Sequence, residues 1–322
     1  TLASAVGMPC NRKFFEATAG KYGMEPAYTL CNGPYYYSLV STNSGYVKLD
    51  KNPEYKGSYK AKVEEVRFVL TDYTKLKSTL TEDGKIDAAV LTDVSGVSDK
   101  YTITPYQNIT KAIFFNMECS LVRIQDLRLA FVYSTDRSLL TKKDATGLIP
   151  DAAQITPGNS YRTAVGTQAI PEFNLETATA HYKQGISGYE NTEELIQLNV
   201  VCLEEDEVPL KRVIQNWQKV FGVKLNISIT TYDTPFALQN ALTKGNYDIA
   251  YAPLECDTIA TNELARFVST SPNNIIHLNN STYDTYIKEA MDSANATEMA
   301  PYLQRAEAAL IRNGYILPVT QQ

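Results

Sequence analysis

The residues that could carry out chemistry are few, and they form no catalytic or metal-binding motif. The chain has two histidines, His181 and His277, and neither lies in a pattern with metal-ligand spacing. H-E-x-x-H, G-x-S-x-G and P-loop patterns, which support zinc, acyl-transfer and phosphate chemistry, are absent from the sequence. None of the 36 acidic residues stands out as an acid/base couple. We therefore predict a protein that is not an enzyme, with no metal ion and no cofactor.

The densest charge in the chain is the acidic run Glu204–Glu207, which follows an apolar strand predicted at 198–202. Carboxylates in this position could favour basic side chains in a ligand. They could equally form a solvated loop whose charge stabilises the amino terminus of the following helix, because that end of a helix is positively polarised. The second interpretation is the more ordinary one.

A strand–helix–strand pattern occurs twice, at Val66–Val90 and Ile227–Tyr251. Each copy begins with period-2 alternation, continues with helical spacing, and reaches a glycine and then a second apolar strand, the mark of a β-α-β unit. In both copies the aspartate lies three residues after the glycine, as in Gly245 and Asp248. Two such units far apart predict two α/β lobes that close on something between them.

The remaining elements surround these units. The clearest helix is 208–221, with an apolar stripe that includes Trp217, and Gly222 ends it. A long segment with little periodicity spans 144–172, and Pro318 predicts an edge or crossover position for the last strand. Further strands are predicted at 35–39, 46–49, 112–116, 198–202, 223–229 and 315–319, and further helices at 125–140, 175–184, 282–292 and 298–312.

Composition limits the class of protein. A hydrophobic content of 44% and a charged content of 20% are those of an ordinary globular protein, long enough for two domains. A net charge of −6 argues against nucleic-acid binding, and no apolar stretch reaches the roughly 18 residues of a membrane span. Among the five cysteines, Cys10 and Cys31 could form a disulfide in an exported protein.

Six segments, in order, resemble the family 5 extracellular solute-binding proteins, the peptide-binding receptors of ABC importers. The similar segments are Asn32-Gly33-Pro34-Tyr35-Tyr36, Val47 to Tyr55, Asn116 with Arg128 and Tyr133 to Arg137, Gly222-Val223, Lys244 to Ile249, and Tyr283-Asp284 with Glu307 and Ile316 to Val319. Each alone is a weak signal, whereas six in the family's order over residues 30–319 are specific.

The resemblance implies an α/β, two-lobed fold of the type II periplasmic-binding-protein class, with one complete lobe and part of the other. It implies a chain shortened at its amino end and slightly at its carboxyl end. The expected division is 1–112 for a partial first lobe, 113–317 for the second lobe, and 318–322 for a segment returning toward the first lobe. Hinges are expected near 110–116 and 317–319.

The same resemblance implies an extracytoplasmic substrate-binding protein of an ABC transporter. It would capture peptides between hinged lobes and deliver them to a membrane permease, as a monomer in the periplasm or on the outer face of the membrane as a lipoprotein. Two alternatives stay open: the same fold could bind another small solute such as a nickel chelate or a sugar, or it could act as a surface interaction module. The two histidines argue against direct metal capture, while 22 tyrosines are compatible with stacking on sugars.

By the resemblance, Asp257 holds the α-ammonium of the ligand, although a loop aspartate can also be a simple cap. Two departures from the family pattern put ligand length and type in doubt: Tyr251 replaces an arginine that could bind a carboxylate, and Leu254 replaces an aromatic residue. We predict ligand contacts by Tyr251, Leu254 and the adjacent Glu255. Tyr232 could line the pocket or belong to the core, and Asn116 could bind in the cleft or make a structural hydrogen bond at the hinge.

Overall fold

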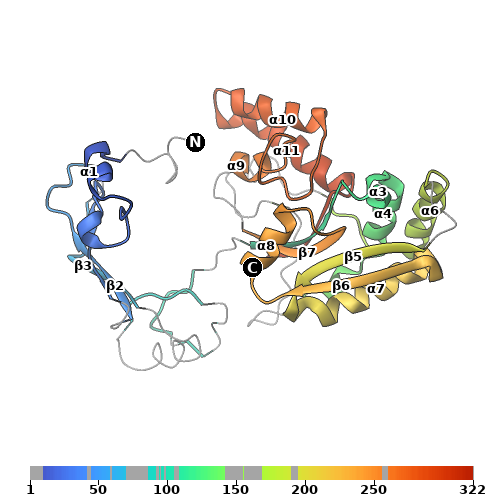
Figure 1. Cartoon of the computed structure of the whole chain (residues 1–322), viewed down its shortest axis with the longest axis horizontal. Coiled ribbons are helices and arrows are strands. Elements are labelled where there is room, and N and C mark those ends of the chain that lie inside the picture. Colours follow the sequence, from blue (N-terminus) through green and yellow to red (C-terminus); the bar gives the residue numbers. More distant parts are fainter. Residues whose placement is uncertain are drawn as a thin grey trace. The chain divides into compact units, whose positions relative to one another are not determined.

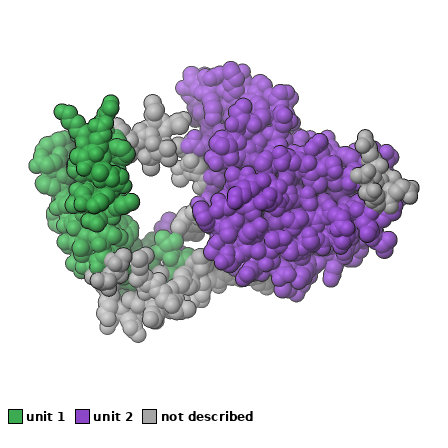
Figure 2. Space-filling view, viewed as in Figure 1, with its two compact units in different colours: residues 1–102 green, residues 103–322 purple. Residues whose placement is uncertain are grey.

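The chain folds into two compact units in the computed structural model, Thr1–Thr102 and Ile103–Gln322 (Figure 2). The structure describes residues 10–41, 45–58, 60–69, 86–91, 94, 96–97, 99–104, 109–141, 155, 169–189, 195–255 and 260–321.

The first unit contains a three-stranded antiparallel sheet in the order β1-β2-β3 (Figure 1). Its strands are β1 Tyr35–Ser41, β2 Tyr46–Lys51 and β3 Glu65–Val69, preceded by α1 Arg12–Ala17 and the 3-10 helix η2 Pro26–Tyr28. The strands predicted at 35–39 and 46–49 are confirmed. Asn52, the residue after β2, is hydrogen-bonded to the segment just before β1. Its backbone N–H donates to the Pro34 carbonyl at 2.8 Å and its side-chain amide donates to the Gly33 carbonyl at 2.9 Å.

The first copy of the predicted β-α-β unit is only partly visible. Its opening strand is β3, while residues 70–85, including the helix and the glycine, lie outside the described residues. Residues 86–91 are irregular rather than a strand, and Val90 is 70% exposed. A strand needs a hydrogen-bonded neighbour, and the described sheet of this unit gives it none. Cys10 and Cys31 are both free thiols in the structure.

The second unit is built on a five-stranded sheet in the order β6-β5-β7-β4-β8. Its strands are β4 Ile109–Phe115, β5 Ile196–Leu203, β6 Leu225–Tyr232, β7 Ile249–Glu255 and β8 Ile316–Gln321. β5 pairs in parallel with β6 and β7, whereas β4 is antiparallel to β7 and β8. The second predicted unit is confirmed as β6, α8 (Pro235–Thr243) and β7, and Pro318 lies in an outer strand as predicted.

Helices cover both faces of this sheet (Figure 1). Successive residues of a strand point to opposite faces, so Ile113 and Tyr251 enter one core while Phe114 and Leu254 enter the other. The core containing Tyr251 is closed by α3 Ser120–Arg123, α4 Gln125–Tyr133, α6 Leu175–Ile186 and α7 Glu207–Phe221. The core containing Leu254 is closed by α8, α9 Ala260–Ala265, α10 Ser281–Asp292 and α11 Ala296–Arg312.

The helices predicted in the second unit are present, but the one expected over 125–140 ends at Tyr133. The hydroxyls of Ser134 and Thr135 donate back to the Ala130 and Phe131 carbonyls at 2.6 and 2.7 Å, so side chains satisfy the last turn. Asp136 then caps the short helix η3 Arg137–Leu139.

The irregular segment predicted at 144–172 contacts the core at two described residues, Ile155 and the partly buried Ile170. Ile155 is fully buried, its N–H donates to Glu307 Oε1 at 2.8 Å, and its carbonyl accepts from the Thr110 hydroxyl at 3.2 Å. These bonds satisfy the backbone groups of a residue buried outside any helix or strand.

The two units divide at 102/103, whereas the sequence placed the lobe boundary at residue 112, inside what is one continuous strand, β4. β8 likewise runs through Gln321 within the sheet of the second unit. The assignment of residues 1–112, 113–317 and 318–322 to lobes stays a prediction.

Candidate ligand-binding edge of the second unit

The parallel strands of the second unit end together along one edge of its sheet. Leu203 and Tyr232 are paired at the ends of β5 and β6, Glu255 pairs with Ile109, and Gln321 pairs with Thr110. We call this region the carboxyl edge and define it as residues 109–111, 203–206, 232–233, 254–255 and 320–321. In open α/β sheets, ligands bind outside the carboxyl ends of the strands.

A buried ion pair lies at the carboxyl edge. Lys111 Nζ is 2.7 Å from Asp206 Oδ2, 2.9 Å from Asp206 Oδ1 and 3.2 Å from Glu205 Oε1. The ammonium also lies 5.6 Å from the centre of the Tyr251 ring. Lys111 and Asp206 are both buried, and the bonds join β4 to the turn that begins α7. An ammonium has three protons, and three carboxylate oxygens accept them here.

The acidic run is therefore only partly a solvated loop. Glu204 and Glu205 are exposed in the 3-10 helix η4 Glu204–Asp206, but Asp206 is buried. Glu207 begins α7 and pairs with Lys211, one turn further on, at 2.7 Å. The run therefore places Glu204 and Glu205 on the surface and uses Asp206 as a structural carboxylate. Glu207 keeps a negative charge at the positively polarised amino terminus of α7.

Tyr251 and Leu254 are both buried, on opposite faces of β7. Tyr251 is 1% exposed and its hydroxyl donates to the Leu140 carbonyl at 3.5 Å. Burial raises the pKa of the Tyr251 hydroxyl well above its usual value, so this side chain stays neutral. Leu254 is 2% exposed and packs in the core beneath α8 to α11. A ligand contact by either side chain stays a prediction.

Glu255 and Tyr232 lie at the carboxyl edge as expected from their place at the ends of β7 and β6. The Glu255 side chain is exposed, while its carbonyl accepts from Arg266 at 2.7 Å. Tyr232 is half-buried against the core beneath α8. Sequence reasoning missed Val208 and Phe236, which are 62% and 76% exposed in the first turns of α7 and α8. Val208 lies five residues after the end of β5 and Phe236 four residues after the end of β6, so the available signal was an apolar residue in the first turn of the helix that follows a strand.

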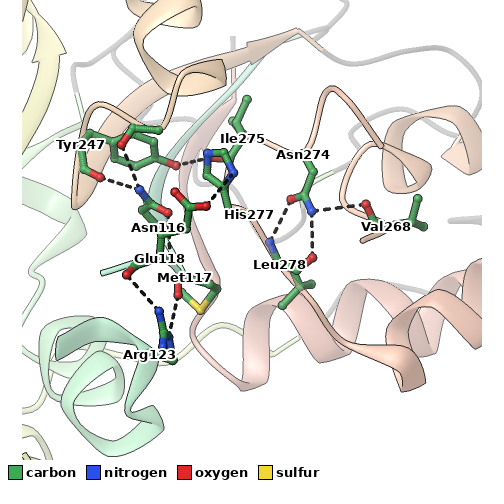
Figure 3. A network of polar contacts seen from close by, with 11 residues as sticks. Asn116, Met117, Glu118, Arg123, Tyr247, Val268, Asn274, Ile275, His277 and Leu278 are labelled. Atoms are coloured by element: carbon green, nitrogen blue, oxygen red, sulfur yellow. Dashed lines mark hydrogen bonds and ion pairs between the residues drawn. The ribbon is translucent and has the colours of Figure 1, made fainter. Parts of the chain in front are cut away.

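Asn116 lies at the opposite edge, because it follows β4, which runs antiparallel to β7. Figure 3 shows its side chain among its polar contacts, beside Tyr247 and Glu118. Its amide donates to the Tyr247 carbonyl at 2.7 Å and to the Gly245 carbonyl at 3.3 Å, and its oxygen accepts from the Glu118 N–H at 3.0 Å. The seven residues of β7 span the distance between the two edges, six steps or about 20 Å at the usual strand rise. The structure thus separates Asn116 from the other described candidates, and its amide makes structural bonds.

The edge around Asn116 is hollowed by two adjoining depressions of about 420 and 380 Å³, both lined by Glu118. His277 Nε2 is buried beside them and has no hydrogen-bond partner among the described residues, and its Nδ1 lies 3.9 Å from Glu118 Oε1. Within the described part of the chain, no group of three histidine, cysteine, aspartate or glutamate residues could hold a metal ion.

Asp257, the predicted ammonium anchor, lies outside the described residues, in the interval 256–259. In the sequence, Asp257 stands two residues after Glu255, the last residue of β7. Its role stays a prediction.

Comparison with known proteins identifies the family. Residues 3–272 match the model of the bacterial extracellular solute-binding proteins, family 5. The chain belongs to this family, whose members are extracellular or periplasmic binding proteins rather than enzymes.

Two curated relatives and one solved structure show the extent of the match. The dipeptide-binding protein of Lactococcus lactis subsp. cremoris (strain MG1363) is 22% identical over 351 residues, covering 100% of this chain and 63% of the relative. The periplasmic murein peptide-binding protein MppA of Escherichia coli (strain K12) is 24% identical over 339 residues, covering 98% and 61%. The structure of Listeria monocytogenes OppA bound to peptide superposes with a TM-score of 0.64 at 19% identity, covering 98% and 63%.

The fold is therefore that of the type II periplasmic binding proteins, and the chain spans about three fifths of the length of these relatives. None of the helices in the described residues is long and apolar enough to cross a membrane.

Proposed function

We propose that the protein is the substrate-binding component of an ABC importer and that it captures peptides at the carboxyl edge of its second unit. The observation that carries the proposal is that three predicted binding residues, Tyr232, Leu254 and Glu255, lie at this one edge of a sheet with the fold of peptide-binding relatives. The exposed Val208 and Phe236 add apolar surface beside them.

A receptor for peptides of varied sequence has to bind what all peptides share. The extended backbone needs hydrogen-bonding partners, and the α-ammonium needs a fixed counter-charge shielded from water. In this proposal Asp257 supplies that charge, and Phe236 and Tyr232 offer apolar contact to ligand side chains. Binding then shifts the protein toward a closed form only because the ligand binds that form more tightly than the open one.

The proposal includes an extracytoplasmic location and a membrane permease as partner. It also includes a monomeric receptor, held at the membrane by a lipid anchor where the organism has no periplasm. The family assignment supports an extracellular or periplasmic site of action.

The test is calorimetry of the purified protein with a pool of tripeptides and with the same tripeptides N-acetylated. Acetylation removes the ammonium and leaves the backbone and side chains intact. Binding of the free peptides that disappears on acetylation is the expected result. Absence of binding to both pools would contradict the peptide proposal, and equal binding of both would contradict an ammonium anchor.

A further inference from the structure

Arg266 brings a guanidinium group to the end of β7 at the carboxyl edge. It directly follows α9, and its Nη2 donates to the Glu255 carbonyl at 2.7 Å and lies 3.1 Å from Glu263 Oε2. The Glu263 side chain is fully buried, so it anchors the guanidinium from inside the protein. These two contacts hold the positive charge beside the last residue of β7.

The contacts of Arg266 use only one of its three side-chain nitrogens. A guanidinium carries five N–H groups, and two of them belong to Nη2. Nε and Nη1 have no hydrogen-bond partner among the described residues, and the side chain is 31% exposed. Three N–H groups of an anchored cation therefore remain for a further acceptor.

Two neighbouring charged side chains leave this position to Arg266. Leu254 packs beneath α8 to α11, the side of the sheet from which Arg266 approaches, so the next residue, Glu255, points its side chain to the opposite face. Lys111, the basic residue within the carboxyl edge, has three carboxylate oxygens within 3.2 Å of its ammonium, and its side chain is buried. A ligand carboxylate that reaches this edge therefore meets available donors on Arg266 rather than on Lys111.

We infer that Arg266 binds the C-terminal carboxylate of the peptide, so that peptides with a free carboxyl end bind more tightly than peptides whose carboxyl end is blocked. This inference rests on the proposed function. A carboxylate matches the charge of the guanidinium, and hydrogen bonds between charged groups are roughly twice as strong as those between neutral groups. An acidic side chain offers the same chemistry, but every unmodified peptide carries a terminal carboxylate.

The test compares Ala-norleucine-Ala, a tripeptide without a charged side chain, with its C-terminal amide by calorimetry. Amidation removes the terminal charge and leaves the backbone and side chains intact. We expect the free peptide to bind roughly tenfold more tightly at low salt, with the ratio shrinking as salt is added, because the guanidinium is partly exposed. Ala-Glu-Ala amide carries its carboxylate only in the side chain, and it should bind as weakly as Ala-norleucine-Ala amide.

Arg266→Gln should bring the ratio of free to amidated affinity close to one, because it removes the cation. This change also removes a partner of the buried Glu263, so Arg266→Lys serves as a second variant that keeps the charge and the fold. Lysine has three N–H groups instead of five, and the ratio should fall to about threefold.

Arg123→Gln is the matched control. Arg123 also donates to backbone carbonyls, those of Met117 and Glu118, both at 3.0 Å, but at the opposite edge of the sheet (Figure 3). Its replacement should leave the ratio of free to amidated affinity unchanged.

The outcomes separate the two proposals. Equal affinity for the free and amidated peptides overturns the carboxylate site and leaves peptide capture standing. An unchanged ratio in both Arg266 variants, with both peptides weakened equally, shows a structural role for Arg266 and also overturns the inference. Ala-Glu-Ala amide binding as tightly as the free peptide overturns the terminal carboxylate as the group that is bound. No binding of any tripeptide overturns the proposed function itself.

Discussion

Lys111 Nζ lies 2.7 Å from Asp206 Oδ2, and both side chains are almost completely buried at the carboxyl edge of the second unit. The two residues are 95 positions apart in the sequence. Their bond fastens the inner strand β4 to the turn between β5 and α7. It therefore fixes the acidic surface beside the proposed ligand site relative to the sheet.

Lys111→Met should destabilise the protein by about 3 kcal/mol or more, because Asp206 loses the cation that compensates for its burial. The double variant Lys111→Met/Asp206→Leu removes both charges and should recover most of that loss. Urea unfolding followed by the fluorescence of Trp217 measures this directly, since the side chain is fully buried and is the single tryptophan.

The matched control is Lys211→Met, which removes a lysine from an exposed i,i+4 pair with Glu207 and should change stability by less than about 0.5 kcal/mol. If the single and double variants of the Lys111 pair were equally unstable, the loss would come from packing rather than from the charge on Asp206.

Sequence patterns predicted the second β-α-β unit, because strand alternation, helical spacing and a glycine stop are all local features. They did not reveal the ion pair. The strand was predicted to begin at residue 112, which excluded Lys111, and the partner of a buried lysine depends on strand pairing between distant segments. Ile155 was missed for a different reason: a single apolar residue in an irregular segment carries no periodicity.

The placement of Asn116 also required the structure. Sequence patterns identify a strand but do not give its direction within the sheet. β4 runs antiparallel to β7, so a residue after β4 lies at the opposite edge from a residue after β7. Only this direction separates Asn116 from Glu255.

Arg128 is a buried cation held by carbonyl groups. It donates to the carbonyls of Val122 at 2.6 Å and Asn313 at 2.8 Å, and its guanidinium lies 4.4 Å from the centre of the Tyr315 ring. Burial lowers the pKa of Arg128 to about 10. Arg128→Lys should cost about 1–3 kcal/mol, because an ammonium cannot reach carbonyls on both sides with the geometry of the guanidinium fork.

Chemical denaturation of Arg128→Lys beside Arg305→Lys tests this prediction. Arg305 also lies over a tyrosine ring, at 5.7 Å from that of Tyr302, but on the exposed side of α11. A similar loss in both variants would show that the ring contact rather than the carbonyl bonds stabilises the protein.

Stability should fall at alkaline pH. Burial raises the pKa of Cys202 to about 12 and the pKa of Tyr247 above its usual range. In the unfolded chain these groups ionise near pH 8.5 and 10, so above these values the unfolded state binds fewer protons than the folded state. Their contribution is therefore complete below about pH 8.5 and decreases as pH rises, by up to about 1.4 kcal/mol per pH unit for each group.

Urea midpoints measured from pH 7 to 10.5 give this slope. Cys202→Ala and Tyr247→Phe should each reduce it, because they remove a group that ionises only in the unfolded state. A slope that none of the buried-group variants alters would contradict the prediction.

Asp257 decides whether the edge described above binds peptides as the family resemblance implies. A salt-bridged ammonium shielded from water contributes on the order of 1.5–3 kcal/mol, so Asp257→Asn should weaken tripeptide binding roughly tenfold or more. Asp233→Asn provides the control, because it removes an equal charge from the end of a neighbouring strand and should have at most a threefold effect on Ala-norleucine-Ala. N-acetylated tripeptides should bind both variants and the parent protein equally weakly. Unchanged affinity for free tripeptides in Asp257→Asn would remove this residue from the binding site, and the search for the ammonium anchor would then move to Glu255.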